Sequence, residues 1–304
     1  MSKNVALVLS SGGARGIAHI GVIEELVKSG YTITSVAGTS MGSMIGGMLA
    51  NGKLPEFTRW LLSFTKMDVV KFLDLTISSG GLIKGEKIMK ELEGFIGDVN
   101  IEDLSIPYAC VASDLTSHNE MVFTKGSLIQ AIRASSSIPT VFLPVNLDGM
   151  LLVDGGVLNP LPIDLVARKD GDILIAVDVN ANIPYQSPEE RQEIINHEKH
   201  FSKLRLALNE KWSGMIDQYV EKYRNGKQPK PKNVNLFDII SESINLSQNR
   251  LTSLAIARHE PDILINLSYK MSTIFDFYRT EELIEAGQIA CRKALDKAEG
   301  ELKA

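Results

Sequence analysis

One serine in the 304-residue chain lies between two glycines at the end of an apolar run, an arrangement suited to nucleophilic chemistry. Gly38-Thr39-Ser40-Met41-Gly42 fits the pattern G-x-S-x-G, in which a strand enters a helix through a very sharp turn. Such a turn holds the serine in a strained conformation with its hydroxyl exposed, and Gly38 and Gly42 leave room for it. The pattern therefore predicts Ser40 as the nucleophile of an acyl transfer.

A serine hydroxyl needs donors that stabilise the oxyanion formed from its substrate. The segment Gly12-Gly13-Ala14-Arg15-Gly16 follows an apolar run at residues 5–9 and precedes a helical pattern. Its backbone N–H groups would lie at a helix N-terminus, which favours anions. We expect this loop to form the oxyanion hole. A dinucleotide-binding loop is disfavoured, because Ser11 occupies the first glycine position of G-x-G-x-x-G.

Two kinds of side chain could accept the Ser40 proton. In an α/β-hydrolase triad the histidine follows the serine in the chain, and three histidines follow Ser40: His197, His200 and His259. That fold builds several strands before its nucleophile, whereas one strand-helix unit precedes Ser40. The other candidate is Asp154, which ends an apolar run and is followed by Gly155 and Gly156. These glycines would let substrate and backbone come close, and the residues alone leave both candidates open.

The elements that must position these groups alternate between strands and helices. Residues 5–9 and 32–38 are apolar strand patterns, and helical patterns follow at 16–30, with Ile20, Ile23 and Val27 on one side, and at 40–52. This order predicts a parallel sheet with right-handed crossovers. Further strands are predicted at 106–113, 151–156, 172–179 and 261–268, and helices at 126–137 and 280–302. Because these strands are apolar for most of their length, we expect helices on both faces of the sheet.

Residues 188–232 differ in composition from the rest of the chain. They contain ten Lys or Arg and seven Asp or Glu, whereas the whole chain has a formal charge of −5. The segment 188–223 predicts a long amphipathic helix with an apolar stripe: Phe201, Leu204, Leu208, Trp212, Met215, Tyr219 and Tyr223. One interpretation packs this stripe on the α/β body. The other places it at the mouth of the active site, in weak contact with a membrane surface or acyl chains.

Four blocks in this order and spacing resemble the patatin-like phospholipase family, in particular its compact bacterial members: SSGGARGIAHIGV, GTSMG, ASSSIPTVFLPV and LVDGGVLNPLP. The resemblance covers about residues 4 to 180. It implies a three-layer α/β/α fold and a Ser-Asp dyad, with Ser40 as nucleophile and Asp154 as base. The resemblance also assigns the oxyanion loop to Gly12, Gly13, Arg15 and Gly16. It implies that neither a histidine nor a metal ion takes part in the reaction. Ser11 departs from the family pattern, which has glycine there.

Taken together, the sequence predicts one patatin-like α/β domain over residues 1–304. Residues 185–235 would form a helical insertion or cap, and residues 236–304 would complete the fold with C-terminal helices. The expected function is a metal-independent lipid acyl hydrolase without a cofactor, acting on a lipid or another acyl ester. The alternative is a catalytically weak regulatory or binding protein that keeps the fold.

Composition narrows the remaining classes. A formal charge of −5 does not suggest a general nucleic-acid binder. Cys110 and Cys291 lie far apart, which predicts neither a disulfide framework nor a metal site. The apolar run at residues 5–9 is too short for a signal peptide, and no run approaches the roughly 18 residues of a membrane span. We therefore expect a cytoplasmic protein with an optional peripheral contact at the inner membrane surface, and the sequence leaves its oligomeric state open.

Overall fold

The computed structural model describes residues 3–68, 85–185 and 236–301. The chain divides into two units, residues 1–183 with 240–304 and residues 184–239. Nearly all of the second unit lies outside the described residues, and so does the amphipathic helix predicted for 188–223.

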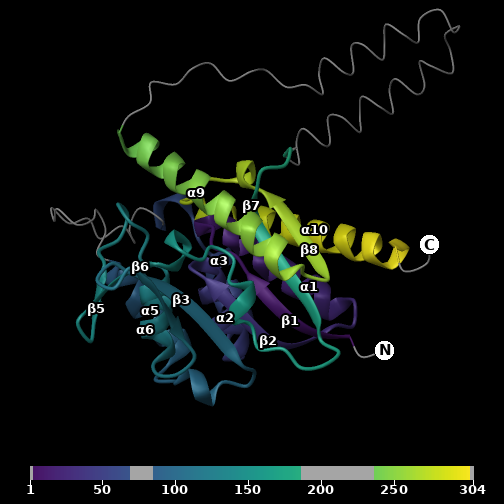
Figure 1. Ribbon diagram of the computed structural model, residues 1–304, viewed down its shortest axis with the longest axis horizontal. Helices are drawn as coiled ribbons and strands as arrows, with labels where there is room; N and C mark the ends of the chain where they lie inside the picture. The colour runs from purple at the N-terminus through teal and green to yellow at the C-terminus, as the bar shows by residue number, and fades with distance from the viewer. Residues whose placement is uncertain (1–2, 69–84, 186–235, 302–304) are drawn as a thin grey trace, which may run out of the picture. The chain divides into compact units, whose positions relative to one another are not determined.

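A mixed, mainly parallel sheet forms the centre of this unit (Figure 1). Its strand order is β5-β6-β3-β2-β1-β7-β8, and β4 pairs with β3 outside this path. The strands that run parallel are β1 (Asn4–Leu9), β2 (Thr32–Thr39), β3 (Tyr108–Asp114), β7 (Ile173–Ala181) and β8 (Ile263–Ser268). The strands that join in antiparallel fashion are β4 (Asn119–Phe123), β5 (Val145–Leu147) and β6 (Met150–Asp154).

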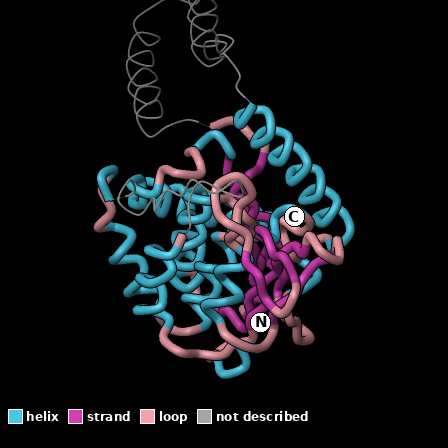
Figure 2. Tube along the Cα trace, turned by 90° about the vertical axis from the view of Figure 1, so that its left-hand side faces the viewer, coloured by secondary structure: helices cyan, strands magenta, loops and turns pink. Residues whose placement is uncertain are grey.

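Helices cover both faces of the sheet, as the apolar strands predict (Figure 2). The helices are α1 (Ala18–Lys28), α2 (Met41–Ala50), α3 (Leu54–Leu62), α5 (Glu86–Ile96), α6 (Leu128–Ser135), α9 (Leu236–His259) and α10 (Thr280–Glu301). On one face, Ala6 and Val8 of β1 pack with Leu174 of β7, and Ala255 and Ile256 of α9 lie against this cluster. Helices α1 and α2 contact β2, and α10 packs on α1. The three-layer α/β/α expectation is therefore confirmed.

Three details differ from the sequence-based expectation. β6 covers residues 151–154 of the strand predicted at 151–156, whose last two residues lie in a 3-10 turn, and it runs antiparallel to β3. β4 and β5 are strands that the sequence did not predict. In α1, Ile20 and Ile23 are buried as predicted, but Val27 is 58% exposed and the neighbouring Leu26 is buried.

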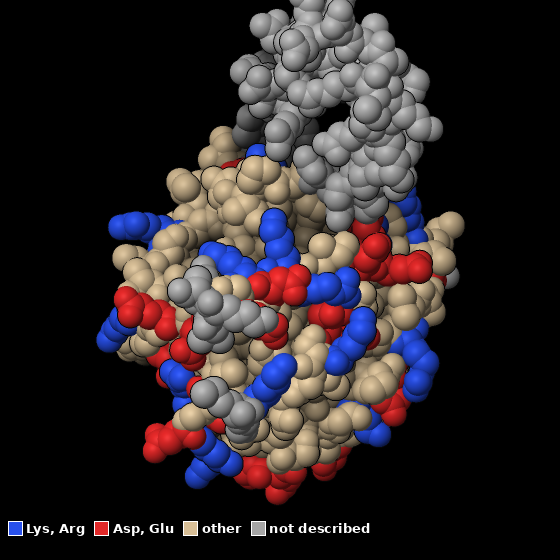
Figure 3. Space-filling view, turned by 90° about the vertical axis from the view of Figure 1, so that its right-hand side faces the viewer, with Lys and Arg blue, Asp and Glu red and all other residues tan. Residues whose placement is uncertain are grey.

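The surface over α1 and α10 mixes charges of both signs (Figure 3). Arg292 of α10 forms an ion pair with Glu25 of α1, with 2.8 Å between Arg292 Nη2 and Glu25 Oε2. Lys28 Nζ lies 3.7 Å from the same carboxylate oxygen. Cys110 and Cys291 are both buried free thiols. Within the described ranges, no helix combines the length and the apolar character that crossing a membrane requires.

Candidate active site

Strand register brings Ser40 and Asp154 to the same level of the sheet. Thr39 of β2 pairs with Val111 of β3, so the next residue, Ser40, lies level with Ala112. Ala112 pairs in turn with Asp154, the last residue of β6. The Ser40 hydroxyl Oγ donates a hydrogen bond of 2.5 Å to Asp154 Oδ2. Both side chains are buried, with exposed fractions of 3% and 4%.

Ser40 lies in the sharp strand-to-helix turn that the pattern predicts. Its backbone has φ 56° and ψ −121°, a conformation that costs energy in a residue with a side chain, and α2 begins at the next residue. A Cβ at Gly38 would collide with the backbone of Gly42, and a Cβ at Gly42 would collide with the carbonyl oxygens of Leu9 and Ser10. Both glycines are therefore required by close approach of the main chain.

Asp154 is held by hydrogen bonds on both carboxylate oxygens. Oδ2 accepts the bond from Ser40, and Oδ1 accepts a bond of 2.7 Å from the amide of Gly156. Burial raises the pKa of Asp154 from 3.8 to about 6, although the hydrogen bonds from Ser40 and Gly156 act in the opposite direction. Gly155 has no room for a Cβ, because its α-carbon lies against the carbonyl of Val111. The buried carboxyl group therefore changes protonation near pH 6.

The C-terminal turn of α6 contacts the backbone of both residues. The amide of Ser40 donates to Ser135 Oγ at 2.9 Å, and the amide of Asp154 donates to the carbonyl of Ser137 at 2.9 Å. This segment belongs to the block ASSSIPTVFLPV, for which the sequence predicted no role. The run of three serines after a short helical pattern was the available signal, and nothing in it indicated which partners the serines would have.

The glycine loop at residues 12–16 lies beside the Ser40 turn. Gly13 has φ 55° and lines the same pocket as Ser40, and a Cβ on Gly16 would collide with the Met41 side chain. The amide of Ala14 donates to the Ile274 carbonyl at 3.1 Å, and the amide of Arg15 donates to the Gly12 carbonyl at 3.2 Å. In the described part of the chain, the amides of Gly12 and Gly13 have no backbone acceptor of this kind. Among the described residues, Gly13 of this loop is the member that lines the pocket beside Ser40.

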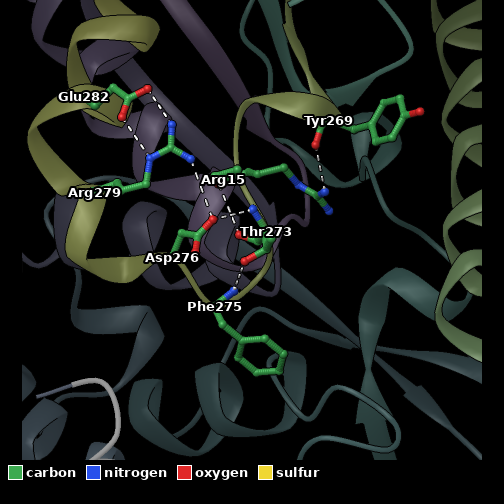
Figure 4. Close-up of polar contacts among 8 residues, drawn as sticks. Arg15, Tyr269, Thr273, Phe275, Asp276, Arg279 and Glu282 are labelled. Atoms are coloured by element: carbon green, nitrogen blue, oxygen red, sulfur yellow. Dashed lines mark hydrogen bonds and ion pairs between the residues drawn. The ribbon is translucent and has the colours of Figure 1, made fainter. Parts of the chain in front are cut away.

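The Arg15 guanidinium group points to the backbone of Tyr269, as Figure 4 shows, and Arg15 is not among the described residues that line the Ser40 pocket. Its Nη1 donates to the carbonyl of Tyr269 at 3.2 Å, and the side chain lines a separate polar cavity with Asn180 and Glu242. Burial lowers the pKa of Arg15, against the opposing charges of Asp178 and Glu242. The side chain therefore supports the loop and does not reach the pocket.

The segment that follows β8 contacts the glycine loop through hydrogen bonds. Besides Tyr269 and Ile274, it contains Asp276, whose Oδ2 accepts a hydrogen bond of 2.8 Å from the Thr273 amide (Figure 4). Arg279 lies 3.7 Å from Asp276 and 2.5 Å from Glu282, which ties this segment to the start of α10. The glycine loop is thus positioned in part by residues more than 250 positions away in the chain.

Serine at position 11 does not disturb the loop. Ser11 is absent from the residues with positive φ, so its backbone conformation does not require glycine. Its amide donates to the Pro160 carbonyl at 2.9 Å, and its carbonyl accepts a bond of 2.6 Å from Asn180 Nδ2. The departure from the family pattern is therefore compatible with a formed loop.

An apolar pocket of about 120 Å³ opens beside Ser40. Aromatic rings form much of its wall: Trp60 lies 4.5 Å from Phe64 and 5.6 Å from Phe57, measured between ring centroids. The remaining apolar lining comes from Met41, Met44, Leu61, Ile88, Met89, Ile138, Val141, Phe142, Ile274, Phe275 and Phe277. Such a lining favours a hydrocarbon chain over a polar ligand.

The histidines within the described residues lie elsewhere. His19 is buried and its Nε2 is bonded to the carbonyl of Ser10 at 2.9 Å, and burial lowers its pKa to about 4. His118 lies in the turn between β3 and β4, and His259 ends α9. His197 and His200 lie outside the described residues. Across the described ranges, no group of three or more His, Cys, Asp or Glu residues is arranged to hold a metal ion.

Comparison with known proteins places this geometry in a family. The patatin-like phospholipase family profile matches residues 7–167. This stretch contains the glycine loop, the Ser40 turn, the serines at the end of α6 and Asp154. A solved structure, VipD from Legionella pneumophila, aligns with 96% of this chain and 66% of its own at 15% identity and a TM-score of 0.47.

Several relatives extend the match. An uncharacterised NTE family protein of Mycobacterium tuberculosis (strain H37Rv) is 33% identical over 98% of this chain and 93% of its own. The Drosophila melanogaster neuropathy target esterase sws is 34% identical over 59% of this chain and 13% of its own. Human patatin-like phospholipase domain-containing protein 6 is 36% identical over 59% of this chain and 14% of its own. The chain belongs to the patatin-like phospholipase family.

Proposed function

We propose that this protein is a metal-independent serine hydrolase that cleaves acyl esters of lipids through an acyl-enzyme on Ser40. The observation that supports this most strongly is the 2.5 Å hydrogen bond from Ser40 Oγ to Asp154 Oδ2, formed by a serine at φ 56°. A buried carboxylate whose pKa is about 6 is ionised at neutral pH and is still basic enough to accept a proton. Ser40 and Asp154 are thus a nucleophile and base in direct contact.

Acylation follows from these positions. Asp154 accepts the proton of the Ser40 hydroxyl while Oγ forms a bond to the ester carbonyl carbon, and the carbonyl oxygen becomes an oxyanion. The amides of Gly12 and Gly13 donate to that oxyanion. The bond to the alcohol oxygen then breaks, and Asp154 returns its proton to the leaving alcohol. The acyl group remains on Ser40.

Deacylation repeats the same proton transfers with water. Asp154 takes a proton from a water molecule, whose oxygen bonds to the acyl carbon and regenerates the oxyanion at the glycine loop. When the bond to Ser40 Oγ breaks, the proton passes from Asp154 to the serine. The products are a carboxylic acid and the free enzyme.

The apolar pocket supports a lipid acyl chain as the part of the substrate that binds beside Ser40. Burial of each methylene contributes about 0.8 kcal/mol, so chain length within the pocket should dominate KM. The family and its esterase and phospholipase relatives support the same substrate class. The alcohol part of the ester is left open by these observations.

Hydrolysis of p-nitrophenyl esters from acetate to palmitate tests the proposal. Wild-type protein should turn over medium and long chains faster than acetate, with and without EDTA. Ser40→Ala and Asp154→Asn should each lose at least about a thousandfold in kcat while staying folded. Single Gln variants of His19, His118, His197, His200 and His259 should retain activity. A folded wild-type protein with no activity would favour the regulatory alternative, and a single inactive histidine variant beside an active Asp154→Asn would favour a triad.

A further inference from the structure

The block ASSSIPTVFLPV ends α6 at a run of three serines, Ser135 to Ser137, that the mechanism above does not use. These residues contact the backbone on both sides of the dyad, although α6 belongs to neither β2 nor β6. We propose that Ser135 is a positioning residue, whose hydroxyl fixes the Ser40 turn so that Oγ stays within reach of Asp154. This inference rests on the proposed function.

The Ser40 amide needs an acceptor that the sheet does not supply. The last pair between β1 and β2 is Leu9 with Gly38, and the last pair between β2 and β3 is Thr39 with Val111. Ser40 therefore lies beyond both ladders, yet it is buried. A buried N–H without a partner destabilises the fold, and the Ser135 hydroxyl, itself fully buried, accepts this one at 2.9 Å.

The same turn of α6 holds the other member of the dyad. The amide of Asp154 donates to the carbonyl of Ser137 at 2.9 Å. Ser137 is fixed in turn by Arg133, whose Nη1 donates to Ser137 Oγ at 2.6 Å and whose carbonyl accepts from that hydroxyl at 2.7 Å. The three-residue segment Ser135–Ser137 thus contacts the backbone of both Ser40 and Asp154, so one short segment helps to set the separation of the two residues.

The α6 helix is well suited to this task, because it is anchored in the core. Leu128, Ala131 and Ile132 have no exposed surface, and Ser127 caps the first turn by accepting from the Gln130 amide. Arg133 Nη2 also donates to the Leu143 carbonyl at 3.1 Å, which joins the end of α6 to the segment leading into β5. Catalytic groups held to within about 0.5 Å require support of this kind.

Replacing Ser135 by Ala removes the acceptor without adding volume. The strained φ of Ser40 is then no longer held by its amide, so Oγ should spend less time within hydrogen-bond distance of Asp154. Misplacement of a reacting group by about 1 Å costs roughly a hundredfold in rate. We expect kcat to fall by about 10- to 100-fold with KM changed less than about twofold, because the apolar pocket is untouched.

The pH profile provides a second readout that loss of stability alone would not move. The hydrogen bond from Ser40 lowers the pKa of Asp154, so loosening that bond lets the pKa rise. The acid limb of kcat/KM should therefore lie at higher pH in Ser135→Ala than in wild type. Ser105→Ala is the matched control, because Ser105 Oγ donates to the Ala50 carbonyl at 2.6 Å before β3, away from the dyad.

The experiment measures ester hydrolysis, its pH profile and the melting temperature of wild type, Ser40→Ala, Ser135→Ala, Ser135→Cys and Ser105→Ala. We expect kcat to decrease from Ser through Cys to Ala at position 135, since a thiol is a weak acceptor, with Ser105→Ala at wild-type kcat. Wild-type kcat and acid limb in Ser135→Ala, or an equal loss in Ser105→Ala, would overturn the inference. If Ser135→Ala does not fold, Ser135→Cys is the deciding variant. A Ser135→Cys protein with the kcat and the acid limb of wild type would refute the inference. Activity that survives Ser40→Ala would instead refute the proposed function.

Discussion

At the scale of single residues, the chemistry depends on how strongly burial acts on one carboxyl group. Asp154 receives hydrogen bonds from Ser40 and Gly156, which favour its ionised form, yet desolvation is the larger effect and raises its pKa to about 6. A histidine would provide a similar pKa without burial. In the proposed mechanism, burial therefore gives Asp154 a pKa close to that of the histidine in a triad.

The first residue-scale prediction concerns the pH dependence of hydrolysis. Asp154 must be ionised to accept the Ser40 proton, so kcat/KM should rise about tenfold per pH unit below the pKa and level off above about pH 6. Stopped-flow or plate assays between pH 4.5 and 8 would measure the acid limb of kcat/KM. At the lowest pH values, a parallel measurement should check that the protein is still folded. A limb near pH 4 would mean that the carboxyl is solvated in the working enzyme.

The second prediction concerns stability, with the sign set by the same shift. Because the folded-state pKa is raised from 3.8 to about 6, the protonated carboxyl favours folding, and this contribution is lost as pH rises through about 6. Asp154→Asn should therefore be more stable than wild type at pH 8. The stability difference should grow by about 1–2 kcal/mol between pH 5 and pH 8. Chemical denaturation of both proteins at the two pH values measures it, and a difference independent of pH would contradict the burial argument.

At the scale of elements, the site is assembled by register. The first strand-helix units, the Ser40 turn and the sheet's mainly parallel character could be predicted, because apolar periodicity and glycine placement are local signals. The antiparallel course of β6 could not be predicted, because a short apolar run such as residues 150–154 does not indicate in which direction the strand runs in the sheet. The contacts of Ser135 and Tyr269 with the site join segments far apart in the chain, and no local pattern specifies such pairings.

The element-scale prediction tests the tight crossing of the Ser40 turn over β1. Gly42→Ala would place a methyl group against the carbonyl oxygens of Leu9 and Ser10, which are backbone atoms that cannot move aside cheaply. We expect a loss of about 1–3 kcal/mol in the free energy of unfolding and loss of hydrolysis. Gly94→Ala in α5 is the control, because nothing lies within 4 Å of the new methyl group and alanine favours the helix by about 0.5–1 kcal/mol. Equal stability of the two variants would contradict the close-approach account.

At the scale of the whole molecule, the proposed function requires a lipid to reach the pocket that opens beside Ser40. The segment 188–232, with its aromatic stripe and basic residues, lies outside the described residues, and its contact with a membrane stays a prediction from sequence. The segment has only a small excess of Lys and Arg over Asp and Glu. This predicts membrane binding that is weak, reversible and sensitive to salt.

Vesicle sedimentation checks this at low salt. Wild-type protein should bind vesicles containing phosphatidylserine, and replacing Lys227, Lys230 and Lys232 by Gln should weaken binding without altering hydrolysis of a short soluble ester. Each removed charge should lower the binding free energy by up to about 1 kcal/mol. No wild-type binding, or no change in Trp212 fluorescence with vesicles, would leave the segment as a structural cap.

The most direct test of the account is to locate the adduct of a lipid-like fluorophosphonate, which traps an activated serine. Intact-mass measurement and peptide mapping of wild type, Ser40→Ala and Asp154→Asn would follow the labelling. If Ser40 and Asp154 form a catalytic dyad, each wild-type chain should carry one adduct, on the peptide that contains Ser40. Ser40→Ala should carry no adduct, and labelling of Asp154→Asn should be strongly slowed. An unlabelled but folded wild-type protein, or an adduct on a different serine, would contradict the assignment of Ser40 and Asp154 as a catalytic dyad.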